Sequence, residues 1–139
     1  MMSNCTGGMV ILTGASSGIG LAMTKALLSN GYSVTGIARS FDAGVINSEN
    51  FEAVTLDLSE LDLLSKRLGE IISEISIPIR AVVHNAGVGK FASVEQLSVP
   101  DMKLVMETNF LSHAIVTKVL LPILKRQDTL ADIVFMGSE

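Results

Sequence analysis

The chain lacks the features that mark several large classes of protein. Its one cysteine, Cys5, excludes an internal disulfide, and a place in the N-terminal tail favours no catalytic use. The formal net charge of -4 does not indicate a positively charged surface for nucleic acid or an anionic membrane. No apolar run approaches the roughly 18 residues that span a bilayer, and the first eight residues lack the basic region of a signal peptide. These absences predict a cytoplasmic protein with no membrane or nucleic-acid partner.

What remains is the composition of one globular domain. The 139 residues are 48% hydrophobic and 17% charged, which allows one sizeable core but not two. Five short apolar runs alternate along the chain with loops and helical patterns. The pattern predicts an α/β, doubly wound (Rossmann-like) parallel sheet of about five strands, with helices on both faces and strand order 3-2-1-4-5.

A glycine-rich stretch follows the first apolar run, residues 9–12. It reads Thr13-Gly14-Ala15-Ser16-Ser17-Gly18-Ile19-Gly20 and leads into a helical pattern that stops at Asn30-Gly31. Gly14 allows a tight turn, Gly18 lets backbone amides approach a pyrophosphate, and Gly20 lets the helix pack closely. The predicted cofactor-binding residues here are Gly14, Ala15, Ser16, Ser17, Gly18, Ile19 and Gly20. The alternative is an ordinary strand-to-helix turn.

The spacing Gly-x-x-x-Gly-x-Gly differs from the standard dinucleotide fingerprint. With the leading Thr-Gly, it resembles the cofactor loop of the short-chain dehydrogenase/reductase family, in its compact, non-extended branch. That resemblance implies a nicotinamide cofactor and hydride transfer to or from a small-molecule carbonyl or alcohol. Further motifs extend this resemblance over nearly the whole chain.

The second predicted strand, residues 32–38, ends at Arg39. An acidic residue at this place accepts from the ribose 2'-hydroxyl of NAD, whereas an arginine accommodates the 2'-phosphate of NADP. Arg39 therefore favours NADP over NAD as cofactor, against the alternative of a solvated loop residue.

After a loop over residues 41–52, a third strand (53–56) is followed by Asp57 and Leu58. The resemblance implies that Asp57 meets the adenine amino group with help from the Leu58 backbone. Asp57 is also placed to start the next helix, which the pattern begins near Ser59 as N-cap and ends by Pro78. Apolar residues at helical spacing predict its buried face: Leu61, Leu64, Leu68, Ile71, Ile72 and Ile75.

The fourth strand, residues 80–84, leads into Asn85-Ala86-Gly87. This triplet also resembles the family, in which it stabilises the central sheet and lies against the cofactor. His84 stands where the family more often has Asn, and we interpret it as a packed strand residue.

A long apolar helix is predicted over residues 100–127. Because it is apolar nearly all round, it must be buried on two sides, and the resemblance implies a homo-oligomer through this helix. Asn109 matches the family's Asn that kinks the helix and holds a water for proton relay; a backbone-bonded Asn is the alternative. His113 could pair with Asn109 and has no predicted role.

A fifth strand, residues 131–136, leads to Ser138, which the resemblance makes the serine that orients the substrate carbonyl. Ser138 and Asn109 are the predicted catalytic residues, and no metal site is predicted. The family also uses a Tyr-x-x-x-Lys pair, but the only tyrosine is Tyr32, and Gly36 stands four residues later.

We therefore expect one dinucleotide-binding domain over residues 1–139, incomplete at its C-terminal side because it stops after the fifth strand. The prediction is an NADP-dependent oxidoreductase of which this chain is a truncated, inactive piece. The alternatives are a non-catalytic NADP-binding regulatory or assembly module and a structural domain without a ligand.

Overall fold

The computed structural model describes residues 6–138, in which a five-stranded parallel sheet is covered by helices. The strands are β1 (Met9–Thr13), β2 (Ser33–Ala38), β3 (Phe51–Thr55), β4 (Ile79–His84) and β5 (Asp132–Phe135). The helices are α1 (Gly18–Ser29), α2 (Leu61–Ser73), α3 (Val99–Met106) and α4 (Ser112–Arg126), with the π-helical segment η1 (Glu107–Leu111) between the last two. The strand order β3-β2-β1-β4-β5 confirms the predicted topology. Cys5 and Glu139 lie outside the described residues.

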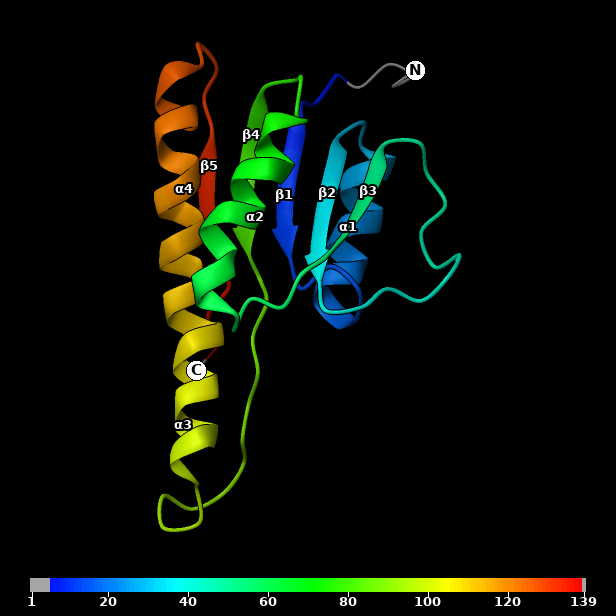
Figure 1. The fold of residues 1–139 in the computed structure, drawn as a ribbon. Helices are drawn as coiled ribbons and strands as arrows, with labels where there is room; N and C mark the ends of the chain where they lie inside the picture. The colour runs from blue at the N-terminus through cyan, green and yellow to red at the C-terminus, as the bar shows by residue number, and fades with distance from the viewer. Residues whose placement is uncertain (1–5, 139) are drawn as a thin grey trace.

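The helices lie on both faces of the sheet. Helix α1 covers one face, and α2 and α4 pack side by side on the other (Figure 1). Strands β1 and β2 are buried along their whole lengths because both of their faces are covered. Strands β3 and β5 form the two edges of the sheet, and much of β5 is exposed, including Phe135 at 60%.

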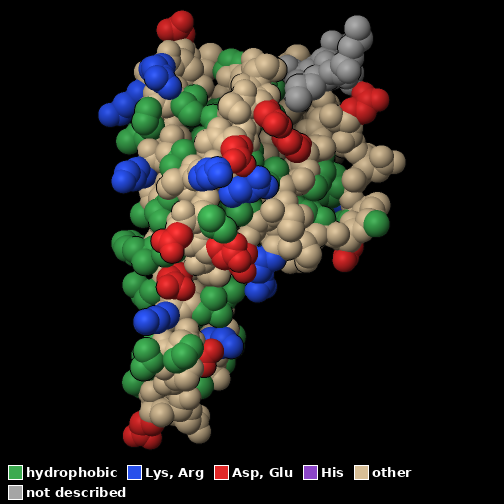
Figure 2. All heavy atoms as spheres, in the orientation of Figure 1, with side chains coloured by type: hydrophobic (Ala, Val, Ile, Leu, Met, Phe, Trp, Pro, Cys, Tyr) green, Lys and Arg blue, Asp and Glu red, His purple; other side chains and the backbone are tan. Residues whose placement is uncertain are grey.

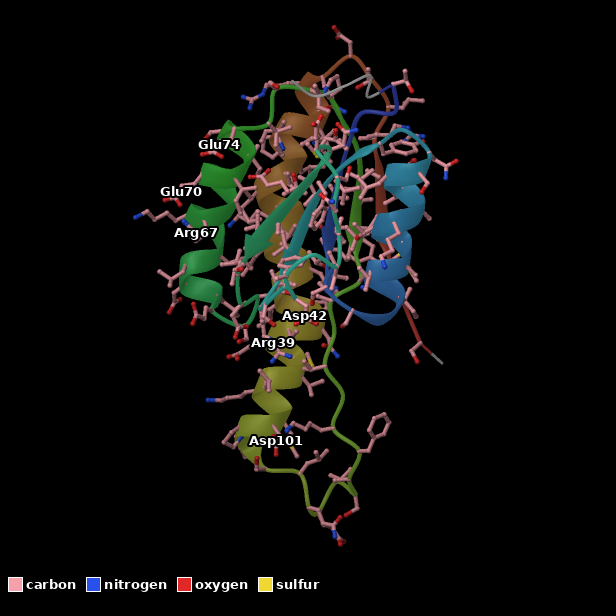
Figure 3. The ribbon with its side chains drawn as sticks, turned by 90° about the vertical axis from the view of Figure 1, so that its right-hand side faces the viewer. Arg39, Asp42, Arg67, Glu70, Glu74 and Asp101 are labelled. Atoms are coloured by element: carbon pink, nitrogen blue, oxygen red, sulfur yellow. The ribbon has the colours of Figure 1, made fainter. Side chains whose placement is uncertain are left out.

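Helix α2 has the predicted buried face, but its ends differ from the prediction. Helix α2 begins at Leu61, and Ser59 does not cap it. The amide and hydroxyl of Ser59 instead donate to Asp57 Oδ1, at 2.9 and 2.7 Å. The helix ends at Ser73, so Pro78 does not terminate it. The opposite face is solvated, with Arg67, Glu70 and Glu74 pointing outward in Figure 3.

The predicted long helix consists of α3, η1 and α4, which run on continuously. Its start projects beyond the sheet (Figure 1), and its end is fastened to β4 by Gln127. The Gln127 amide accepts from the backbone N–H of Ile79 at 3.1 Å and donates to the carbonyl oxygen of Ile79 at 2.7 Å. This side chain therefore satisfies both backbone groups of the first residue of β4.

One side of this helix packs on the rest of the chain, and the side that the prediction gives to a partner subunit is exposed in the single chain, so burial on two sides stays a prediction. Phe110, Leu111 and Leu121 are exposed on it, and hydrophobic side chains gather along its edge of the molecule in Figure 2. The run Val99–Arg126 is also long and apolar enough to cross a membrane by length and composition: an 18-residue window of it has a mean hydropathy of 1.2, and 28% of that window is buried. The sequence prediction, which considered unbroken apolar runs, overlooked it. Core helices of soluble proteins pass the same test, and α4 packs here against α2 and β4.

Candidate nucleotide-binding site

A cavity of about 360 Å3 lies at the carboxyl ends of the strands. The chain leaves β1 toward α1 on one face of the sheet and leaves β4 toward α3 and α4 on the other. Such a change of side marks the place where open α/β sheets bind ligands. The cavity is lined by Gly14, Ser16, Ser17, Gly18, Ile19, Ile37, Ala38, Arg39, Leu56, Asp57, Leu58, Asn85, Ala86, Gly87, Val88, Leu104 and Thr108.

The glycine loop forms one wall of this cavity. Gly14 has φ +71° and donates from its amide to the carbonyl oxygen of Ile37 at 2.8 Å, which turns the chain sharply out of β1. A Cβ on Gly20 would lie 1.9 Å from the carbonyl oxygen of Gly14, so the close approach requires glycine. Ser17 precedes α1 in an extended conformation, and its side chain forms no capping hydrogen bond. The first amides of α1 are therefore available to an anion.

The Asn-Ala-Gly triplet is locked onto the end of β1. The buried Thr13 hydroxyl oxygen accepts from the backbone amides of Asn85 and Ala86, each at 3.1 Å. The Asn85 side chain donates to the carbonyl oxygens of Thr13 and Gly14, each at 3.2 Å. These bonds join β1 to β4 where they border the cavity, as the family resemblance implied for the sheet.

Arg39 and Asp57 lie on the β2 and β3 side of the cavity. Arg39 is exposed, directly after β2, and Figure 3 shows it at the end of the sheet. Within residues 6–138 no carboxylate forms an ion pair with it. Asp57 lines the cavity, and its Oδ1 accepts hydrogen bonds from the amide and hydroxyl of Ser59, just before α2 begins. Its contact with adenine stays a prediction.

Asn109 lies in the π-helical segment and fastens the loop that follows β4. Its Oδ1 accepts from the amide of Val88 and its Nδ2 donates to the carbonyl oxygen of Val88, both at 2.8 Å. The alternative of a backbone-bonded Asn is therefore confirmed. π-Helical turns occur frequently at functional sites, so the geometry also leaves room for the role implied by the resemblance.

Two buried histidines stand beside this loop. His113 does not pair with Asn109; its Nε2 donates to the carbonyl oxygen of Ala86 at 3.0 Å. His84 is fully buried, as predicted for a packed strand residue, with its ring 4.9 Å from that of His113 and 4.6 Å from that of Phe135. Burial, and to a smaller extent the charge of nearby His113, lower the pKa of His84 to about 4. His84 is therefore neutral at physiological pH.

Ser138 is not brought into this cavity. It lies beyond β5 and is exposed, and it is not among the described residues that line the cavity at the strand ends. Asn109 lines a second, more open cavity of about 750 Å3 between α4 and β5, which we call the α4 groove. The groove is lined by Asn109, Phe110, His113, Ala114, Thr117, Lys118, Leu121, Pro122, Lys125 and Phe135.

The structure thus gathers most of the predicted cofactor residues in one place. All of them line the cavity except Ala15 and Gly20, which are buried behind it. Six lining residues were not predicted: Ile37, Ala38, Leu56, Val88, Leu104 and Thr108. The first three lie at or directly after the ends of β2 and β3, and the predicted strand ends could have identified them as cavity residues. Nothing local to Leu104 or Thr108 shows that their helix reaches the cavity.

The fold and the cavity define a dinucleotide-binding protein of the Rossmann class. A sequence model of the family described as short chain dehydrogenase matches residues 8–139. The chain therefore belongs to the short-chain dehydrogenase family, as its motifs indicated.

Similar proteins agree with this assignment. A probable short-chain type dehydrogenase/reductase of Helicobacter pylori, VdlC, is 34% identical over 123 residues, covering 86% of this chain and 44% of its own length. The structure of ElxO with NADP bound has a TM-score of 0.81 at 22% identity, covering 94% of this chain and 55% of ElxO. A 4-hydroxyisoleucine dehydrogenase complexed with NADH has a TM-score of 0.78 at 22% identity, with the same shares covered. The chain thus spans about half the length of these proteins.

Proposed function

We propose that this chain provides the cofactor-binding half of an NADP-dependent oxidoreductase. The enzyme would transfer a hydride between the cofactor and a small-molecule carbonyl or alcohol. Family membership supports the oxidoreductase class, and the observation that carries the choice of NADP is Arg39 at the end of β2. The two cofactor complexes of similar fold hold NADH in one case and NADP in the other, so the fold alone does not choose between them.

The residues around the cavity fit a dinucleotide. The glycine loop leaves no room for a side chain at Gly20, and the first amides of α1 are available to a pyrophosphate. Asp57 and Leu58 would hold the adenine, and Asn85, Ala86 and Gly87 would line the opposite wall. An unpaired guanidinium such as Arg39 forms charge-assisted hydrogen bonds with a phosphate, worth about 1.5–3 kcal/mol each.

For the chemistry, the bound cofactor supplies the hydride transfer, and the protein supplies orientation and protons. Ser138 would donate a hydrogen bond to the substrate oxygen, and Asn109 would hold the helix and the loop after β4 in place. The 139 residues contain one tyrosine, Tyr32, which lies just before β2 at the end of the strands opposite the cavity. No Tyr-x-x-x-Lys pair is therefore present here to serve as proton donor. Loss of a general acid lowers the rate by about 10²- to 10⁴-fold, so we expect little turnover from this chain alone.

Calorimetric titration with 2',5'-ADP, 5'-ADP and NADPH tests this proposal. We expect 2',5'-ADP to bind nearly as well as NADPH and at least tenfold more tightly than 5'-ADP. Arg39→Asp should abolish the preference for 2',5'-ADP over 5'-ADP. The matched control is Arg67→Asp, the same charge change on the outer face of α2, which should leave the preference unchanged. An unchanged preference in Arg39→Asp would contradict the assignment of NADP.

A second candidate is a non-catalytic NADP-binding regulatory or assembly module. The sequence of the complete coding frame separates the two candidates. A downstream Tyr-x-x-x-Lys pair supports the enzyme, and a natural stop after residue 139 supports the module.

We also propose that a second copy of this chain docks on the α4 groove. Phe110 and Phe135 border the groove and are each 60% exposed. The start of the long helix carries two carboxylates, Asp101 and Glu107, and one cation, Lys103, whereas its end carries only cations: Lys118, Lys125 and Arg126. An antiparallel pair of these helices would therefore place opposite charges together.

Light scattering during size-exclusion chromatography tests the oligomeric state. We expect a dimer that Phe110→Asp converts to a monomer. The control is Phe91→Asp, a fully exposed aromatic outside the groove, which should leave the dimer intact. A monomeric wild-type chain at 100 μM, about the concentration at which weak pairs form, would refute this proposal.

A further inference from the structure

The loop after β4 is held from two directions. On its inner side, Thr13 and the Asn85 side chain join it to β1 and the glycine loop. On its outer side, the long helix holds it at two backbone positions: Asn109 bonds both backbone groups of Val88, and His113 Nε2 bonds the carbonyl oxygen of Ala86 at 3.0 Å. The cavity wall made by Asn85, Ala86 and Gly87 therefore takes its position from both sides.

This position matters because the loop lies directly against the glycine loop. A Cβ on Gly14 would be 2.9 Å from the Cα of Ala86 and 2.9 Å from Asn85 Nδ2. No space separates the two walls at this point. A shift of Ala86 toward Gly14 would cause a clash, so a loosened Ala86 moves away and changes the width of the cavity.

His113 is built to hold one orientation. Its side chain is 8% exposed, and its ring lies next to those of His84 and Phe135, which limits rotation. The carbonyl oxygen of Ala86 only accepts, so Nε2 of His113 must carry a proton. The ring therefore acts as a fixed hydrogen-bond donor behind the cavity wall.

We propose that His113 is a positioning residue for the nucleotide cavity, acting through its hydrogen bond to the carbonyl oxygen of Ala86. This role rests on the proposed function, since it concerns binding of the same nucleotide. His113 touches no part of the cavity itself and acts only through the loop.

Three variants of the 139-residue chain separate the hydrogen bond from the ring stacking. His113→Phe keeps an aromatic ring and removes the donor, whereas His113→Gln keeps an N–H donor and removes the ring. Thr117→Val removes the hydroxyl 2.9 Å from His84 Nε2, so it perturbs the same cluster without touching the bond to Ala86. Each variant is titrated with 2',5'-ADP by calorimetry, and its melting temperature is recorded beside the titration.

We expect His113→Phe to lower the affinity by about three- to tenfold, the range for a lost neutral hydrogen bond. His113→Gln should recover most of that loss, and Thr117→Val should stay within about twofold of wild type. A purely structural role would instead make affinity follow melting temperature across the three variants. Equal affinity in wild type and His113→Phe overturns the inference while leaving the proposed function standing.

A measurement without nucleotide tests the geometry. Long-range ¹H–¹⁵N spectra of the imidazoles should show a proton on Nε2 of His113, the atom that faces the carbonyl oxygen of Ala86. A proton on Nδ1 instead would overturn the inference whatever the titrations show. A folded wild-type chain that binds no 2',5'-ADP overturns the proposed function, and this inference with it.

Discussion

Adding one methyl group to Gly20 tests how tightly the cavity walls fit together. The new Cβ would lie 1.9 Å from the carbonyl oxygen of Gly14 and 2.6 Å from Asn85 Nδ2, whereas carbon and oxygen atoms approach to about 3.3 Å. The Gly14 carbonyl must then move by more than 1 Å. That carbonyl also accepts from Asn85, so the movement breaks part of the link between β1 and β4.

The expected cost combines overpacking with lost hydrogen bonds. Overpacking costs about 1–3 kcal/mol, and each lost hydrogen bond about 1 kcal/mol. Gly20→Ala should therefore lower the free energy of unfolding by about 2–4 kcal/mol, a large share of the roughly 5–15 kcal/mol of a typical domain. Urea denaturation followed by circular dichroism measures the difference.

Two other glycines provide matched controls for the same substitution. Gly69 lies on the exposed side of α2 with nothing within 4 Å of its Cβ, so Gly69→Ala should raise stability by about 1 kcal/mol. Gly18 also has open space, but its φ of +51° makes Gly18→Ala cost about 1–2 kcal/mol. A Gly20→Ala protein within 1 kcal/mol of wild type, or costing no more than Gly18→Ala, would refute the reasoning.

Three further predictions concern stability. The pKa of His84 is about 4 in the folded protein against an ordinary 6.5, so the folded protein binds fewer protons than the unfolded chain between these pH values. The free energy of unfolding should therefore fall by about 3 kcal/mol as pH falls from 6.5 to 4. Urea denaturation at pH 7.5 and 4.5 should show a smaller loss for His84→Gln than for wild type, and equal losses would contradict this. Thr13→Val keeps the volume but leaves two backbone donors without their acceptor, so we expect a loss of about 2–4 kcal/mol by urea denaturation; a loss under 1 kcal/mol would show that water or another acceptor replaces the hydroxyl. Gln127→Leu leaves both backbone groups of Ile79 unpaired and should cost about 1–3 kcal/mol, with faster amide exchange at the start of β4; unchanged exchange there would argue against the fastening.

Much of the fold followed from sequence because it rests on short-range patterns. Apolar runs of four to seven residues alternate with helical periodicity, and parallel strands joined by helices allow few topologies. The glycine loop was recognisable because its spacing reflects a backbone requirement at Gly14 and Gly20. Arg39 and Asp57 were placed correctly at the cavity because each directly follows a strand of the same parallel sheet.

Other features depend on contacts between residues far apart in sequence. Ser59 has the chemistry of an N-cap, but Asp57 binds its hydroxyl first and the helix starts two residues later. The partners of Asn109 and His113 are backbone groups more than twenty residues away, which no local pattern specifies. The apolar periodicity of α4 indicated a second surface to be covered, but periodicity alone does not say what covers it.

Two primary amides tie the long helix to β4 and its following loop, and each bonds both backbone groups of one residue. Gln127, directly after α4, bonds Ile79 at the start of β4, and Asn109, in η1, bonds Val88 in the loop after β4. The helix is thereby attached to β4 and its following loop at two separate points. Sliding or tilting the helix then carries the strand along, and with it the loop that walls the nucleotide cavity. Whatever docks on the outer face of α4 would thus communicate mechanically with the nucleotide, although the two never touch.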